Sequence, residues 1–130
     1  MSVLTGYVPT PVGEAALEAA IQEARRRNLP LVVLNATTGG SGEDRNYADD
    51  ETANQLRRQL EETGLDYQLL RSSASHEPAE EIVGMAKDLD VDIIVIGLRR
   101  RTPVGKLLMG STAQRVLLDA HCPVLAVKAS

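Results

Sequence analysis

Segments of strand length alternate with segments of helical periodicity along this chain, and that alternation restricts the possible folds more than any other feature. Five segments are short and apolar or alternating, at residues 3–8, 31–34, 66–71, 91–96 and 123–127. Between them, apolar residues recur every three or four positions, as on one face of a helix. Such a succession predicts an α/β fold with a parallel sheet, because parallel neighbours need a long crossover.

The segments of helical periodicity carry their own start and stop signals. Thr10 and Pro11 introduce a helix expected over about 12–28, and an acidic group at 49–51 introduces a second that Gly64 ends. Pro78 begins a third, whose apolar face includes 79, 82, 83, 86 and 89. A short fourth helix is expected from the apolar positions 113, 116, 117 and 120.

The apolar patterns also indicate where each strand lies in the sheet. Residues 91–96 are the most apolar run and predict a central strand, whereas 66–71 predict an edge strand. We expect one domain over residues 1–130: a doubly wound, Rossmann-like, three-layer sandwich whose five-stranded parallel sheet has the order 3-2-1-4-5. Ligands of such sheets bind at the carboxyl ends of strands where the strand order reverses, which favours the segments after strands one and four.

Composition excludes several classes of protein. Cys122 is the only cysteine, so no disulfide framework can form within the chain, and a cytoplasmic location is expected with Cys122 as an inert core thiol. The net charge of -4 disfavours nucleic acid as a partner. No apolar stretch approaches the roughly 18 residues of a membrane span, and no Cys/His spacing predicts a metal site.

The segment from Gly97 to Thr112 carries the clearest functional signal. Amide groups of Gly110, Ser111 and Thr112 would stand at the positive end of a helix with two hydroxyls beside them, a geometry that suits a polyphosphate. Ser111 also begins a Ser-x-x-Gln capping box, which would explain this helix start without a ligand. Likewise, Arg99 and Arg100 fit either a phosphate clamp or a solvated loop face.

This segment resembles the universal stress protein family. The family motif is Gly, two residues, Gly, nine residues, then Gly and Ser or Thr; Gly97, Gly110 and Ser111 match it, and a Cys-Pro-Val triplet follows at Cys122. The resemblance implies an HUP-type fold, a role in the stress response and binding of ATP, with Mg, at Gly97, Gly110, Ser111 and Thr112. It also implies a homodimer formed through the last strand, which begins with Pro123 and ends with Val127.

Two positions depart from the family pattern. Arg100 replaces the second glycine, and Val8 stands where ATP-binding relatives usually carry an aspartate that contacts the nucleoside. Thr10 can offer a weaker hydroxyl in its place, although its alternative role is to cap the first helix. Adenine recognition would then depend on backbone groups near Asn35. We expect weaker nucleotide binding than in a relative with the full motif, or a different ligand.

Three functions therefore remain open. The first is a regulatory protein with an adenine-nucleotide pocket and no dedicated turnover, since no residue pattern identifies a hydrolytic base. The second is an ATP-free homodimeric interaction module whose pocket is filled by Val8 and Arg100. The third is an enzyme of unknown substrate. Thermal denaturation with and without nucleotide would separate the first from the second, because only the first predicts that nucleotide stabilises the fold.

Overall fold

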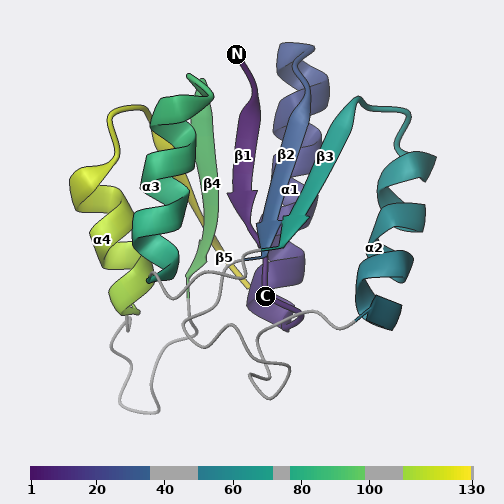
Figure 1. The fold of residues 1–130 in the computed structure, drawn as a ribbon, viewed down its shortest axis with the longest axis horizontal. Coiled ribbons are helices and arrows are strands. Elements are labelled where there is room, and N and C mark those ends of the chain that lie inside the picture. Colours follow the sequence, from purple (N-terminus) through teal and green to yellow (C-terminus); the bar gives the residue numbers. More distant parts are fainter. Residues whose placement is uncertain (36–49, 72–76, 99–109, 130) are drawn as a thin grey trace.

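The computed structural model describes residues 1–35, 50–71, 77–98 and 110–129, and these form a sheet flanked by helices (Figure 1). The described ranges contain five strands and four helices that alternate along the chain. In order, they are β1 (Val3–Gly6), α1 (Pro11–Arg27), β2 (Leu31–Asn35), α2 (Asp50–Glu62), β3 (Tyr67–Arg71), α3 (Pro78–Asp88), β4 (Ile93–Leu98), α4 (Ser111–Asp119) and β5 (Val124–Lys128).

The sheet confirms the predicted class and strand order. Its strands lie in the order β3-β2-β1-β4-β5, and every neighbouring pair is parallel. Val3 of β1 stands opposite Leu31 on one side and Ile93 on the other, so β1 is central. The strand order reverses between β1 and β4, because β1 leads through α1 to β2 whereas β4 leads through α4 to β5.

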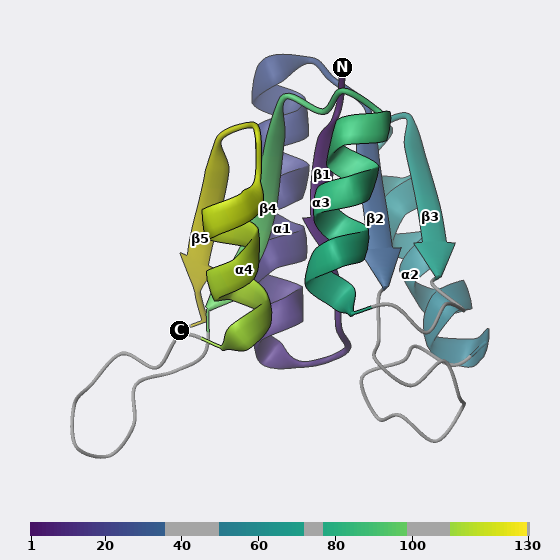
Figure 2. The same cartoon turned by 60° about the vertical axis from the view of Figure 1, so that its left-hand side comes forward.

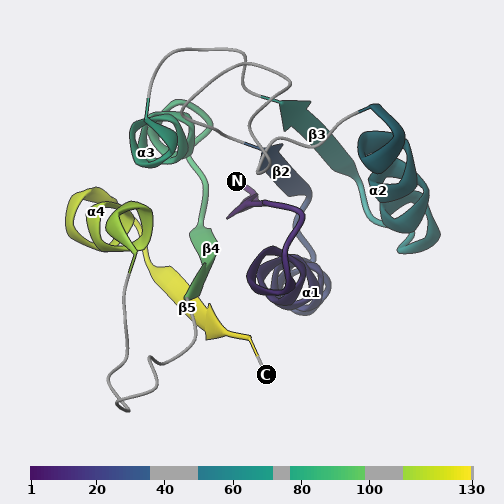
Figure 3. The ribbon, with the colours of Figure 1, turned by 90° about the horizontal axis from the view of Figure 1, so that it is seen from below.

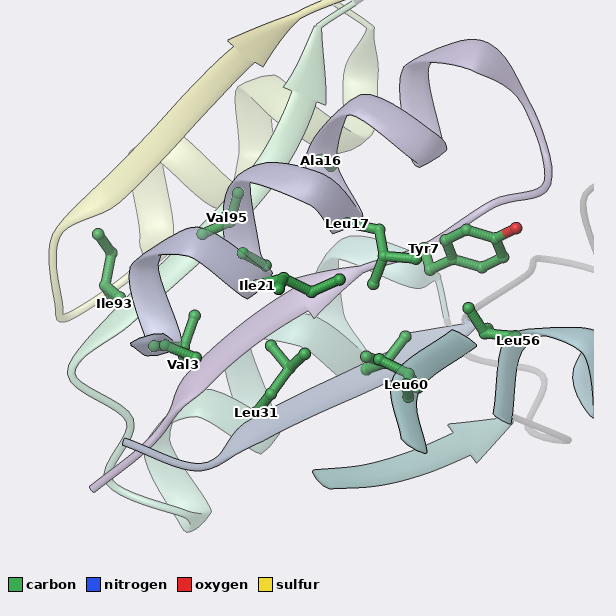
Figure 4. Close-up of a cluster of buried hydrophobic side chains, with 13 residues drawn as sticks. Val3, Tyr7, Ala16, Leu17, Ile21, Leu31, Leu56, Leu60, Ile93 and Val95 are labelled. Atoms are coloured by element: carbon green, nitrogen blue, oxygen red, sulfur yellow. The ribbon is translucent and has the colours of Figure 1, made fainter. Parts of the chain in front are cut away.

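Helices cover both faces of the sheet, which explains the continuous apolar runs of its strands. In Figures 2 and 3, α3 and α4 lie on one face and α1 and α2 on the other. Val3 and Leu31 join the core cluster beneath α1 and α2 (Figure 4), whereas their neighbours Leu4 and Val32 join the cluster beneath α3 and α4. Because side chains alternate between two buried faces, polar residues are accepted only where they are hydrogen-bonded, as Thr5 is to the Val95 carbonyl.

Several strand boundaries differ from those predicted. β1 ends at Gly6 instead of residue 8, since the Val8 carbonyl accepts a hydrogen bond from the Thr10 amide at 2.8 Å and turns the chain. β4 extends to Leu98, which pairs with Lys128 of β5. β4 starts at residue 93 instead of 91, and β5 starts at residue 124 instead of 123. Both strands therefore lie closer to the carboxyl edge of the sheet than predicted.

The helices match the expected buried stripes with two exceptions. Ala53, Leu56 and Leu60 of α2 are buried as predicted. Leu89 is 40% exposed because α3 ends at Asp88 and Leu89 caps it, and Leu117 is 38% exposed because α4 contacts its core cluster through residues 113 and 116. No helix within the described residues is both long and apolar enough to cross a bilayer.

Candidate functional site

The carboxyl ends of the strands meet at one edge of the sheet, the lower edge in Figure 1. α1 and α4 also begin at this edge, so two helix N-termini flank the reversal point between β1 and β4. In doubly wound folds this is the position at which ligands bind. The predicted site residues that the structure describes lie along this edge, on β2, β4, α4 and the turn before α1.

The start of α4 has an arrangement that suits an anion. Gly110 is the N-cap residue, no side chain of the described residues caps the helix there, and the first turn carries no acidic residue. The first intrahelical hydrogen bond runs from the Gln114 amide to the Gly110 carbonyl at 3.0 Å, so the amides of residues 111–113 precede it. These N–H groups and the helix dipole together favour negative charge at this point.

The alternative interpretation of Ser111, as the N-cap of a capping box, is wrong. A capping box requires Ser111 to be the N-cap, with an extended backbone and its oxygen accepting from the Gln114 amide. Instead, Ser111 is the first helical residue, and the Gln114 amide donates to the Gly110 carbonyl. The polyphosphate hypothesis requires a helix start of this kind, at which no capping side chain accepts hydrogen bonds from the first amides.

Gly97 lies inside β4, not at the start of the loop that the sequence predicted. A Cβ atom on Gly97 would stand 2.4 Å from Cγ1 and 2.6 Å from the carbonyl oxygen of Val12 in α1. Both distances are far below van der Waals contact, so only glycine lets the first turn of α1 pack against β4. This residue therefore brings α1 close to the candidate site and does not turn the chain.

Thr10 and Asn35 already hold the backbone at the same edge. The Thr10 hydroxyl oxygen accepts from the Gly13 amide at 3.2 Å and caps α1, as the alternative interpretation of Thr10 predicted. Asn35 is fully buried, and its side-chain amide donates to the Tyr7 carbonyl at 2.8 Å, which ties the end of β2 to the segment after β1. Arg99 and Arg100 lie outside the described residues.

Two features of the turn between β1 and α1 were not predicted. The Tyr7 hydroxyl donates to Oε1 of Glu14 at 2.6 Å, and burial together with this carboxylate raises the pKa of Tyr7 above its ordinary value. A Cβ on Gly13 would lie 1.7 Å from the Val8 carbonyl oxygen, so the turn closes tightly on the helix. The sequence held one signal for this close approach of the Val8 carbonyl to α1, namely a glycine in the first turn of an expected helix.

Arg115 links the middle of α4 to the start of α3. Its guanidinium lies 2.8 Å from a Glu77 oxygen and 3.7 Å from oxygens of Glu80 and Asp119. Because the Arg115 side chain is 44% exposed, solvent screens these pairs and each contributes little stability. The packing of α4 beside α3 rests instead on the core cluster that buried residues of the two helices share.

Comparisons with known proteins identify relatives over nearly the whole chain. Residues 1–128 match the Universal stress protein family. A universal stress protein of Mycolicibacterium smegmatis is 40% identical over 126 residues, which cover 97% of this chain and 96% of the relative. A universal stress protein structure from Archaeoglobus fulgidus has a TM-score of 0.75 at 30% identity, covering 98% of both chains. The universal stress protein from Archaeoglobus fulgidus in complex with dAMP has a TM-score of 0.68 at 26% identity and the same coverage.

Proposed function

Because this chain belongs to the universal stress protein family, we propose that it is a cytoplasmic stress-response regulator that binds an adenine nucleotide without turning it over. The observation that carries the proposal is the start of α4, where Gly110 caps the helix without a side-chain hydrogen bond. The dAMP complex of a relative with the same fold supports an adenine nucleotide as the ligand.

The phosphates of the nucleotide are proposed to contact the amides and hydroxyls of Ser111 and Thr112, close to Gly110. ATP carries more phosphate groups than ADP or AMP and so presents the most anionic groups to this helix start; it is therefore the proposed nucleotide, with a Mg ion that neutralises part of the phosphate charge. Arg99 and Arg100 follow β4 in the chain and are proposed to neutralise phosphate charge. Gly97 contributes by letting α1 approach β4, which shapes the edge on which the ribose would lie.

Nucleoside binding is proposed to use backbone groups near Asn35, together with the hydroxyl of Thr10. Both side chains already make the hydrogen bonds described above, which tie them to the neighbouring backbone at Gly13 and Tyr7. Val8 offers no carboxylate to the nucleoside. We therefore expect weaker binding than in relatives that carry an aspartate at this position.

Dimerisation through β5 is the second part of the proposal. β5 pairs with β4 on one side only and forms an edge of the sheet, and its segment of four apolar residues precedes Lys128. An edge of this kind is a template for another strand. Antiparallel pairing of β5 with the same strand of a second copy would satisfy its outward backbone groups under two-fold symmetry.

Thermal denaturation with and without MgATP tests the nucleotide proposal. A nucleotide present at about 100 times its dissociation constant should stabilise the fold by about 2.7 kcal/mol. Gly110→Val should abolish this stabilisation by blocking the close approach of phosphate to the backbone. Because Gly110 has a φ of -65°, valine fits the local backbone; valine is a poorer N-cap than glycine and lowers the stability of the unliganded protein as well, so the measured quantity is the shift that MgATP adds to each protein.

Gly84→Ala is the matched control, since a Cβ at Gly84 would have no atom within 4 Å. It should retain the full ATP response. If millimolar MgATP fails to stabilise the wild-type chain, the ATP-free homodimeric interaction module becomes the better function. That alternative draws support from Val8, from the structural hydrogen bonds of Thr10 and Asn35, and from Arg100 at a motif glycine.

A further inference from the structure

A hollow beside the proposed nucleotide site lies between the start of α1 and the middle of α2, and Thr10 borders both. Its volume is about 390 Å³, within the range of small-molecule sites. Tyr7 and Leu56 line it, and each is only 3% exposed. Figure 4 shows the Tyr7 hydroxyl directed away from the core cluster, on the side where Leu56 of α2 lies. α1 and α2 cover one face of the sheet, whereas α4 covers the other.

Polar groups line the hollow from both helices. Glu14 contributes a carboxylate from α1, while Gln55 and Gln59 contribute side-chain amides from successive turns of α2. Amide oxygens and carboxylates accept hydrogen bonds from charged donors. This lining therefore offers several acceptors around one anionic group.

The charge of the lining is negative. Among the described residues that line the hollow, Glu14 is the only charged one, and none is Lys, Arg or His. The Tyr7 hydroxyl donates to Oε1 of Glu14 at 2.6 Å, which fixes the position of the carboxylate. Burial and Glu14 raise the pKa of Tyr7, so the phenol stays protonated as a donor. An anion would meet Glu14 with no compensating cation, so this hollow is unsuited to phosphate.

Of the remaining lining residues, Thr10 and Thr52 carry hydroxyls, and the other three are apolar. Pro9 and Pro11 flank the turn before α1, and Leu56 faces them from α2. Rigid proline rings and a buried leucine provide surface for methylene groups, which gain free energy when they leave water. A ligand that fits both kinds of wall combines an aliphatic chain with a positively charged donor.

We propose that this hollow binds a small aliphatic amine, with its ammonium group on Glu14 and its methylene chain against Pro9, Pro11 and Leu56. The ammonium would donate to the Glu14 carboxylate, and the amide oxygens of Gln55 and Gln59 would accept from the same or a second ammonium. This site goes beyond the proposed nucleotide function, because it has the opposite charge preference and its acceptors come from α1 and α2 instead of from the start of α4; Thr10 borders both sites.

Three probes with the same four-carbon chain and different end charges test the proposal. Full-length protein is titrated with 1,4-diaminobutane, butane-1,4-diol and succinate, and binding is followed through NMR shifts of Glu14 and of the side-chain amides of Gln55 and Gln59. We expect the diamine to bind at least about tenfold more tightly than the diol, because hydrogen bonds to a charged group are the stronger ones. Succinate should not shift these resonances.

Glu14→Gln preserves the size of the side chain and its ability to accept from Tyr7 but removes the charge. It should weaken diamine binding at least about tenfold. Glu18→Gln is the matched control, since Glu18 is an exposed acidic residue one turn later in α1 and does not line the hollow. This control should bind the diamine as the wild type does.

Three results would overturn the proposal: equal affinity for the three probes, equal loss of diamine binding in the two variants, or no shift at about 10 mM diamine. Thermal denaturation of Glu14→Gln would establish that the variant is folded. The same variant should keep the ATP response of the wild type, so failure of the amine site and failure of the nucleotide site are separate outcomes.

Discussion

Replacing Gly97 by alanine should destabilise the fold through a contact that joins β4 to α1. The added Cβ would lie 2.4 Å from Val12 Cγ1 and 2.6 Å from the Val12 carbonyl oxygen. Carbon atoms in contact normally stand about 3.5–4.0 Å apart, so α1 or β4 must move by about 1 Å. Since one of the two obstacles is backbone, a change of side-chain rotamer cannot remove it.

The expected cost follows from two opposing effects. Overpacking of a close contact costs about 1–3 kcal/mol, and the involvement of backbone places this case at the upper end. Alanine recovers about 0.5–1 kcal/mol because glycine loses more conformational freedom in a strand. The net loss should be about 2 kcal/mol, which lowers the melting temperature of a chain of this length by about 8 °C.

Urea unfolding followed by circular dichroism measures this loss, with Gly84→Ala as the control. Gly84 lies within α3, and its Cβ would have no atom within 4 Å, so alanine there should stabilise the fold by about 0.5–1 kcal/mol. Adding Val12→Ala to the Gly97 variant removes the Cγ1 contact but leaves the carbonyl oxygen. This double variant should therefore recover only part of the loss. A Gly97→Ala protein as stable as the wild type would refute the packing role assigned to Gly97.

Four further predictions follow from single contacts. Thr10→Ala should cost about 1 kcal/mol in urea unfolding, because it removes the hydrogen bond to the Gly13 amide at the start of α1. Asn35→Ala should cost about 1–3 kcal/mol in the same assay, because it removes a buried donor to the Tyr7 carbonyl. The pKa of Tyr7 is raised in the folded protein, so the free energy of unfolding should be retained below pH 10 and should fall above it, where the phenol ionises only in the unfolded chain. This fall should be smaller in Tyr7→Phe. Ala126→Pro should convert the proposed dimer to monomers on a sizing column, because the pairing of Ile94 with Val124 directs the Ala126 amide outward; an unchanged dimer would contradict pairing through β5.

The alternation of strands and helices along the chain was predictable because its cause is local. Strands buried on both faces need consecutive apolar residues, as in β2 and β4, and parallel strands need the helices between them. The start of α1 was predictable for the same reason, since Thr10 and Pro11 act on their own neighbours. Gly110, Ser111 and Thr112 could be singled out from spacing, although the sequence left open whether Ser111 capped the helix.

Tertiary structure alone decided which groups meet across the chain. Gly97 is a glycine because of Val12, a residue 85 positions earlier whose approach no local pattern encodes. The hollow between α1 and α2 likewise depends on Glu14 facing Gln55 and Gln59 from a separate helix. The sequence of a segment determines whether it forms a helix or a strand, because capping and burial act on the residues of that segment. Contacts between segments depend on the distances at which packed helices and strands come to rest, and those distances are set by the whole core.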